Sequence, residues 1–354
     1  MSKMLAEIRE QPQALERTLK SEWKRAKKLR AHFEKHRPRL IVLAARGTSD
    51  NAAQFARYLL EITTGIPVSL AAPSVYTLYQ SNVDLRETLV VAISQSGEST
   101  DTNVVLEQAR ARGAFTVGIT NEPRSTLAGL AEHTLFVRAR KERSVAATKT
   151  YTGQLLACYL LAYAIGPSGE KAKWRVDLDQ LERIPEMAQA ALTMEEKVAE
   201  RCQRYRYMDH SVVVGRGLNY SNAFEFALKL METCYVVAER FSAADFMHGP
   251  IAMVGSSFPA FLFAPSGVTW PGIREMRDKL KSLEAETLVI TDQSNEPAAK
   301  AKDSQALVLP FAVEELYSPI PYVIPAQLFA ARLAAEKGLN PDQPRTLQKV
   351  TLTM

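Results

Sequence analysis

The sequence is poor in cysteine and lacks a long apolar run, and both features narrow the class of protein. Its 354 residues include three cysteines, Cys158, Cys202 and Cys234, with no CxxC pair. That spacing argues against a disulfide framework and a cysteine zinc site, and it suits a reducing compartment. The longest apolar run, Leu155–Gly166, is shorter than the roughly 20 residues needed to cross a bilayer. The first residues show no apolar signal-peptide core. We therefore expect a cytoplasmic protein with no membrane partner.

The composition is that of an ordinary globular protein. Hydrophobic residues make up 46% of the chain and charged residues 23%, which argues against intrinsic disorder and against a collagen-like or coiled-coil chain. Since domains cluster at about 100–200 residues, the length predicts two of them.

Positive charge is concentrated near the N-terminus. Residues 17–40 contain ten Lys or Arg and two Glu, whereas the whole chain has a net charge of +5, so the remainder is slightly acidic. Apolar residues recur through this segment at helical spacing, which predicts an amphipathic helix with a basic solvent face. Nucleic-acid binding is the alternative, but we find no aromatic-interleaved basic patch or reader motif elsewhere. We expect no nucleic-acid partner.

Apolar β-branched runs alternate with helical patterns twice along the chain. Arg46–Glu61, RGTSDNAAQFARYLLE, is similar to Arg216–Glu232, RGLNYSNAFEFALKLME, and each segment follows a predicted strand. Strands that alternate with helices predict a parallel sheet covered on both faces. The sequence therefore predicts an α/β protein made by duplication. We expect an N-terminal helical segment (1–38), a first domain (39–168), a helical linker (169–208), a second domain (209–335) and a C-terminal tail (336–354).

A hydroxyl-rich loop follows the predicted strand at 88–93. Ser94, Ser96, Ser99, Thr100 and Thr102 crowd between the strand and the next helix. Backbone N–H groups at a helix N-terminus bind anions, and hydroxyl groups add donors. The loop does not fit GxxxxGK[ST], which disfavours a nucleoside triphosphate. Helix capping is the alternative, but a cap needs only one hydroxyl. We therefore expect a phosphate monoester here.

Three other residues are weaker candidates on their own. His248 precedes Gly249-Pro250, which could present its ring on a loop, although a lone loop histidine is usually structural. Glu232 lies in a largely apolar helical pattern, where most carboxylates are structural, and Lys349 lies near a terminus. The Gly215-Arg216-Gly217 segment lacks the third glycine of a dinucleotide fingerprint.

These residues together resemble the sugar isomerase (SIS) family. Nearly the whole chain is similar to the isomerase half of glutamine–fructose-6-phosphate aminotransferases, and the resemblance implies two tandem SIS domains, each a three-layer αβα sandwich. It rests on ordered motifs spread over more than 300 residues: EIREQP (7–12), RGTS (46–49), SQSGES (94–99), ATKTYTGQ (147–154), GRG (215–217), ALKLMETCY (227–235), HGP (248–250) and DQPRTLQK (342–349).

The resemblance also implies roles for individual residues. Glu232 matches the base that moves a proton between C1 and C2 of the sugar, and His248 matches a ring-opening histidine that reaches across from a neighbouring subunit. Lys349 matches a lysine that can form an imine, while Lys229 and Val145 match residues lining the sugar site. The contacts to a hexose 6-phosphate match Ser49, Ser94, Gln95, Ser96 and Ser99. A homodimer with no metal and no organic cofactor is implied.

The sequence departs from the aminotransferase pattern in three places. No cysteine precedes Cys158, although the family's glutaminase domain begins with a nucleophilic cysteine, so we expect no glutamine hydrolysis by this chain. The family's Val-Ala-Ser-Thr-Lys reads Val145-Ala146-Ala147-Thr148-Lys149, which lacks one hydroxyl. Met231 stands where a lysine is expected before Glu232, which removes a cation.

We therefore expect a glucosamine-6-phosphate deaminase that forms fructose 6-phosphate and ammonia. A fructosamine-6-phosphate deglycase has the same chemistry with a larger leaving amine. A synthase subunit whose glutaminase is a separate chain is another alternative. A non-catalytic sugar-phosphate sensor is disfavoured, because the glutamate, histidine and tail lysine are all present.

Overall fold

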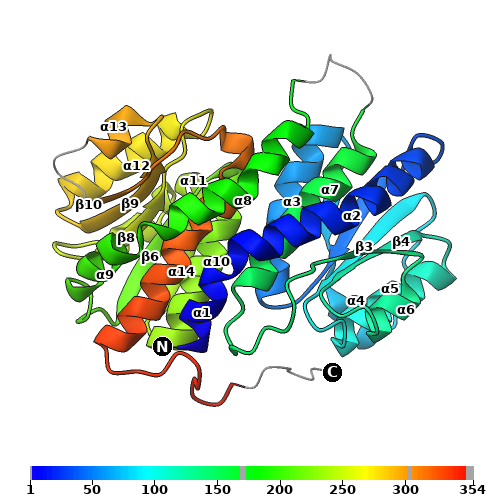
Figure 1. Ribbon diagram of the computed structural model, residues 1–354, viewed down its shortest axis with the longest axis horizontal. Helices are drawn as coiled ribbons and strands as arrows, with labels where there is room; N and C mark the ends of the chain where they lie inside the picture. Colours follow the sequence, from blue (N-terminus) through cyan, green and yellow to red (C-terminus); the bar gives the residue numbers. More distant parts are fainter. Residues whose placement is uncertain (1, 168–172, 301–304, 348–354) are drawn as a thin grey trace. The chain divides into compact units, whose positions relative to one another are not determined.

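The computed structural model describes residues 2–167, 173–300 and 305–347, which form two compact units (Figure 1). One unit, called unit 2, contains residues 13–142 and 149–182. The other, called unit 1, contains residues up to Pro12, the segment 143–148, and residues 183–347. Lys349 lies outside the described residues. Among the described residues, no helix is both long and apolar enough to span a membrane.

The sheet of unit 2 has five parallel strands in the order β2-β1-β3-β4-β5. Its three inner strands form because apolar β-branched runs can be buried on both faces, and β3 is buried at every position. Ala44 of β1 pairs with Ala92 of β3 at the carboxyl end of this pair. The strands are β1 (Leu40–Ala44), β2 (Val68–Leu70), β3 (Thr88–Ser94), β4 (Phe115–Thr120) and β5 (His133–Phe136).

Helices cover both faces of this sheet. One face packs on α4 (Pro73–Thr77), α5 (Thr100–Ala111) and α6 (Thr126–Leu130), through a core that includes Val90, Val105 and Leu127. On α3 (Thr48–Thr64) and α7 (Lys149–Ile165), Phe55 and Tyr159 meet edge to face at 5.1 Å between ring centroids. α3 is amphipathic, whereas α7 is apolar on nearly all sides and is buried along nearly its whole length.

The basic segment forms most of α2 (Gln11–Phe33), which ends before the last basic residues of that segment. Its Lys20 side chain is exposed, as the predicted solvent face requires. Glu22 is the acidic exception: its buried carboxylate accepts the Phe136 N–H at 3.1 Å and pairs with Arg138 at 2.6 Å. A buried carboxylate needs such partners, so Glu22 fixes α2 against β5.

The sheet of unit 1 repeats this design. Its strands are β6 (His210–Gly215), β7 (Val237–Ser242), β8 (Pro259–Phe263), β9 (Glu286–Asp292) and β10 (Gln305–Leu309), all parallel, in the order β10-β9-β8-β6-β7. Because β6 is the first strand of this half, the order of the five strands is the same in both units. This confirms the predicted duplication and the α/β fold.

The faces of the second sheet are also covered. A core that includes Val214, Leu262 and Met276 joins one face to α11 (Ala243–Met247), α12 (Trp270–Ser282) and α13 (Glu296–Ala299). An aromatic cluster of Phe226, Phe261 and Phe329 joins β8 to α10 (Tyr220–Cys234) and α14 (Pro319–Glu336), with centroids 5.0–5.6 Å apart. The remaining helices of unit 1 include α1 (Lys3–Arg9) and α9 (Glu195–Gln203), while α8 (Leu178–Leu192) begins in unit 2 and continues into unit 1.

Candidate active site

The hydroxyl-rich loop lies at the topological switch point of the unit 2 sheet. From β1 the chain moves outward to β2, and then returns to place β3 on the other side of β1. Ligands in open α/β sheets bind outside the carboxyl ends of the strands at such a point. Residues 46–49 come just after β1, and residues 94–99 begin with Ser94, the last residue of β3, so both predicted phosphate-binding segments leave the sheet at this point.

Hydrogen bonds of its own shape the 94–99 loop. Ser94 Oγ accepts the Gly97 N–H at 3.1 Å, and Ser96 Oγ accepts the Glu98 N–H at 3.2 Å. In both bonds the serine oxygen is the acceptor, so each hydroxyl proton can still be donated to an anion. Gly97 has φ +68° and carries no Cβ, which would lie 2.2 Å from Ser125 Oγ. The loop therefore requires glycine at this position.

Ser99 occupies the N-cap position of α5 without capping it. Its side chain makes no cap hydrogen bond, and its Oγ lies 3.0 Å from Thr102 Oγ1 instead. The loop is also held to its surroundings, since Asn103 Nδ2 donates to the Gly97 carbonyl and Glu98 accepts the Thr126 N–H. The capping alternative therefore does not account for Ser99.

The neighbouring 46–49 loop is joined to the same helix. Arg46 Nη2 lies 2.7 Å from Asp101 Oδ2, and the Asp101 side chain in the first turn of α5 is buried. Ser49 Oγ is also buried and accepts a hydrogen bond from Gln154 Nε2 at 2.9 Å. Burial raises the pKa of Asp50, an effect that the nearby Arg46 partly offsets. Arg46 thus joins the 46–49 loop to the first turn of α5, the helix that follows the 94–99 loop.

Replacing Ser99 with alanine is expected to weaken binding of a hexose 6-phosphate rather than slow its turnover. A hydrogen bond to a charged group contributes about 1.5–3 kcal/mol, so KM should rise roughly 10- to 100-fold while kcat stays nearly constant, as for a contact that persists through the reaction. Steady-state kinetics checks this. The control is Ser69→Ala, at an exposed position of the edge strand β2. An unchanged KM in folded Ser99→Ala contradicts the assignment.

The predicted proton-transfer residue lies on α10 in unit 1. Most of this helix is buried, but the Glu232 side chain keeps 22% of its surface exposed. Lys229 Nζ, which is fully buried, lies 2.6 Å from Glu232 Oε2 and 3.4 Å from Glu225 Oε1. The spacing of 225, 229 and 232 places the three groups on one helix face. Lys229 thus provides a cation beside Glu232, although position 231 is methionine.

The other predicted residues of unit 1 have distinct environments. His248 is exposed and ends α11, immediately before Gly249, which has φ +140°. Val145 is half-buried in the segment 143–148. Buried Glu7 of α1 holds this segment by accepting the N–H groups of Arg143 and Ser144. The EIREQP motif therefore fixes the segment that carries Val145.

The predicted site residues fall into two groups. Unit 2 carries the five predicted phosphate contacts, and unit 1 carries Glu232, His248, Lys229 and Val145. Two partners were not predicted as site residues: Arg46, through its pair with Asp101, and Gln154, which lies 105 positions from Ser49. Arg46 lies in RGTS and Gln154 lies in ATKTYTGQ, two of the motifs that resemble the SIS family. Membership of these motifs is the sequence signal that could have identified both residues.

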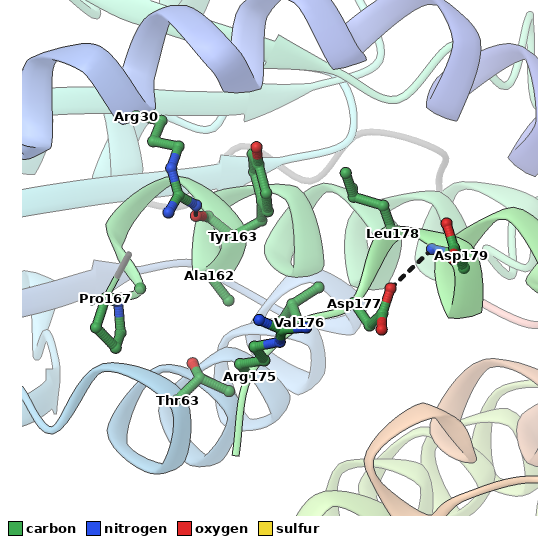
Figure 2. Close-up of a pocket in the computed structure, with 11 residues that line it drawn as sticks. Arg30, Thr63, Ala162, Tyr163, Pro167, Arg175, Val176, Asp177, Leu178 and Asp179 are labelled. Atoms are coloured by element: carbon green, nitrogen blue, oxygen red, sulfur yellow. Dashed lines mark hydrogen bonds between the residues drawn. The ribbon is translucent and has the colours of Figure 1, made fainter. Parts of the chain in front are cut away.

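Other features of the described residues show different chemistry. All three cysteines are buried without disulfides, and burial raises the pKa of each thiol, that of Cys234 to about 11. None is therefore a ready thiolate nucleophile. Unit 2 contains a cavity of about 340 Å³, whose lining includes Arg30, Tyr163 and Arg175 (Figure 2). No predicted site residue lines this cavity. Within the described residues, no cluster of three His, Cys, Asp or Glu side chains could hold a metal ion.

Comparison with known proteins identifies the family. The SIS domain family matches residues 35–164 and 206–337, which correspond to the two sheets described above. The chain belongs to the SIS domain family. Its duplicated architecture is therefore that of two SIS domains in tandem.

Relatives of this SIS protein include metabolic enzymes. It is 38% identical over 315 residues to the glutamine–fructose-6-phosphate aminotransferase [isomerizing] of Gloeobacter violaceus, covering 87% of this chain and 51% of that protein. The chain thus spans about half the length of the curated relatives it matches.

Solved structures show the same fold. The C-terminal domain of glucosamine-fructose-6-phosphate aminotransferase from Francisella tularensis has a TM-score of 0.87 and 27% identity, covering 97% of this chain and 98% of that one. Glucosamine-6-phosphate deaminase from Thermotoga maritima has a TM-score of 0.79 and 22% identity, covering 99% of this chain and all of that one. At that identity the second likeness concerns the fold alone.

Proposed function

We propose that this SIS protein is an aminosugar-phosphate isomerase that converts glucosamine 6-phosphate to fructose 6-phosphate and ammonia. The observation that carries the proposal is Glu232, a partly exposed carboxylate on a largely buried helix, held at 2.6 Å by the buried ammonium of Lys229. A fixed carboxylate of this kind suits proton transfer next to a carbonyl or imine carbon. The likeness to isomerizing aminotransferases supports the same chemistry.

The proposed reaction consumes one water and needs no other co-reactant. His248 assists ring opening by delivering a proton to the ring oxygen as the bond from C1 to that oxygen breaks and the C1 hydroxyl loses its proton. In the open chain, Glu232 takes the proton from C2, which carries the amine, and the electron pair shifts toward the C1 aldehyde. The aldehyde oxygen takes up a proton, which gives an enaminol with a C1=C2 double bond. Delivery of the C2 proton to C1 and loss of one proton from the amine nitrogen then leave a C1 alcohol and a C2 imine. Water adds to C2 and ammonia leaves, which gives the ketose.

The phosphate is the anchor in this proposal. Ser94, Gln95, Ser96 and Ser99 bind it with neutral donors at the N-terminus of α5, with Ser49 from the adjoining loop. Binding energy from a part of the substrate that does not react can be used to orient the part that does. Lys229 and Val145 line the sugar site. Lys349, outside the described residues, is assigned to imine formation with the open sugar.

The proposal is tested by incubating the protein with glucosamine 6-phosphate and measuring ammonia and fructose 6-phosphate. We expect equal amounts of the two products, and no turnover of glucosamine without its phosphate. Fructosamine 6-phosphates made from amino acids are assayed in parallel. Turnover of those esters alone contradicts the deaminase and favours the deglycase. Tight binding of glucosamine 6-phosphate without turnover of any ester contradicts catalysis and favours a sensor.

A second candidate is the isomerase part of an aminotransferase that runs toward glucosamine 6-phosphate. The 38% identity with a protein of that name favours it. The same proton transfer then runs in reverse and requires a source of ammonia. Fructose 6-phosphate with ammonium chloride, and separately with glutamine, distinguishes the two directions: synthesis without measurable ammonia release from glucosamine 6-phosphate favours this candidate.

His248 implies a homodimer if its ring serves the neighbouring subunit's site. We expect a mixture of inactive Glu232→Gln and inactive His248→Ala chains to regain part of the activity after exchange of subunits, because one mixed arrangement contains both intact groups. Activity is measured before and after the exchange. No recovery in mixed dimers verified by mass contradicts the shared site.

A further inference from the structure

The second SIS domain contains a loop that matches the phosphate loop of the first. Residues 264–269 follow β8 as residues 94–99 follow β3, at the switch point of the second sheet. Each loop has a Ser-Gly pair, with a positive φ of +68° at Gly97 and +145° at Gly267. Each ends in a hydroxyl residue at the N-cap of the next helix, Ser99 for α5 and Thr269 for α12.

The loop after the first strand of each sheet also matches. Arg46-Gly47 follows β1 and Arg216-Gly217 follows β6, and the two glycines have φ of +57° and +58°. The duplication has therefore kept both loops and their glycines at the switch point of each sheet. The backbone differs at the N-cap, where Ser99 is extended and Thr269 is helical. The loops 94–99 and 264–269 differ in the side chain that contacts the N–H and hydroxyl donors at the start of the next helix.

In the second loop a carboxylate lies at the helix N-terminus. Glu315, which is only 7% exposed, accepts the Thr269 N–H at 3.2 Å and the Thr269 hydroxyl at 2.7 Å. It approaches the loop so closely that a Cβ on Gly267 would lie 2.2 Å from Glu315 Oε2. In the first loop, the equivalent hydroxyl of Ser99 is bonded to Thr102.

We propose that Glu315 is a built-in ligand of the second SIS domain, whose carboxylate replaces a phosphate and closes that loop to phosphate esters. Two oxygens of a carboxylate can take up donors that would otherwise bind two oxygens of a phosphate group. Gly267 gives the carboxylate its space, as glycine does where a backbone must approach a ligand closely.

Burial and hydrogen bonding act in opposite directions on the Glu315 carboxylate. Burial raises its pKa above the ordinary value for glutamate, and hydrogen bonds from Thr269 and from the Val268 backbone only partly offset that effect. A raised pKa in the folded state means that the ionised form is less favourable there than in the unfolded chain, so its contribution to stability is lost as the pH rises through that pKa.

The test is to empty the second loop and to look for phosphate in it. Glu315→Ala, Glu314→Ala and the unaltered protein are crystallised at neutral pH and soaked in inorganic phosphate. Glu314 is the matched control, because it has the same charge and is exposed. We expect phosphate at residues 264–269 in Glu315→Ala alone, with the number bound per chain, measured by calorimetry, rising from one to two. The expectation that the unaltered protein binds one phosphate per chain rests on the proposed function. The expectation that Glu315→Ala opens the second loop does not depend on that function.

Each outcome separates the two proposals. A folded Glu315→Ala protein with no phosphate at 264–269 overturns the inference, whether or not the 94–99 loop is filled. Phosphate at 264–269 in the unaltered protein, with Glu315 displaced, also overturns it. Phosphate at 264–269 in the variant with an empty 94–99 loop supports the inference and contradicts the proposed phosphate site. If the alanine variant does not fold, Glu315→Gln replaces it, because glutamine keeps the shape of glutamate but has one acceptor oxygen. We expect phosphate to displace the glutamine amide from the second loop. Absence of phosphate at residues 264–269 in this variant overturns the inference.

Discussion

Glu232→Gln is expected to lower kcat by about 10²- to 10⁴-fold, the usual contribution of a positioned acid or base. The amide has nearly the shape of the carboxylate but cannot accept the C2 proton. Binding of the sugar phosphate should persist, since the predicted phosphate contacts lie in the 46–49 and 94–99 loops. Steady-state kinetics measures kcat, and calorimetry measures the affinity for fructose 6-phosphate.

Glu239→Gln is the control for that variant. Glu239 lies on the edge strand β7 with half of its side chain exposed, and its weak ion pair is with the adjacent Arg240. We expect kcat within twofold of the unaltered value. If folded Glu232→Gln retains its kcat, then Glu232 is not the base; if it loses both kcat and affinity, then Glu232 acts in binding.

Lys229→Met is expected to lower the free energy of unfolding by about 3–5 kcal/mol, the usual cost of removing one partner from a buried ion pair. Methionine fills the space of the aliphatic stem. However, it leaves the fully buried Glu225 and the partly buried Glu232 without the ammonium that lies 3.4 and 2.6 Å from them. Denaturation by urea at neutral pH, monitored by circular dichroism, measures the change.

The double variant Lys229→Met/Glu225→Gln provides the matched comparison. Removing one of the two carboxylate charges should restore at least half of the lost stability, since the interaction between neighbouring groups is not additive. Two results contradict the account: a loss below about 1 kcal/mol in Lys229→Met, or no recovery in the double variant. Either shows that the buried charges do not depend on Lys229.

The inner strands and two of the edge strands, β5 and β10, can be predicted from the sequence, but the edge strands β2 and β7 cannot. β3 is buried at all seven positions and reads as a continuous apolar run, which is the pattern of an inner parallel strand. β2 has three residues and β7 reads VAERFS with alternating or partial exposure. Edge strands pair on one side only and tolerate charge. β2 and β7 therefore lack the continuous apolar pattern, and the sequence predicts neither of them.

The ends of helices are harder to predict where a proline lies inside the helix. The sequence pattern favours a last helix over Pro325–Lys337, but α14 begins at Pro319 and continues through Pro325. Proline at the first turn is favourable, whereas proline inside a helix removes a hydrogen bond. From its local sequence alone, Pro325 therefore resembles the first residue of a helix.

The site was predictable to the extent that its signals are local. Five hydroxyl residues within nine positions predict the anion loop, and the resemblance to SIS proteins is the source of the proposed roles of Glu232 and His248. The pair of Arg46 with Asp101 and the bond of Gln154 to Ser49 join residues 55 and 105 positions apart. Glu315 lies 46 positions from Thr269. Such contacts follow from the crossover connections of the sheet, and no local pattern encodes them.

Proton exchange in D₂O tests the central claim most directly, namely that a phosphate-anchored sugar loses a proton to Glu232. Fructose 6-phosphate is incubated with the protein, and deuterium at C1 is followed by NMR. We predict exchange by the unaltered protein, exchange at least 100-fold slower with Glu232→Gln, and no measurable exchange of fructose without its phosphate. Equal exchange rates for the unaltered and Glu232→Gln proteins, or equal rates for fructose and its 6-phosphate, would contradict the account.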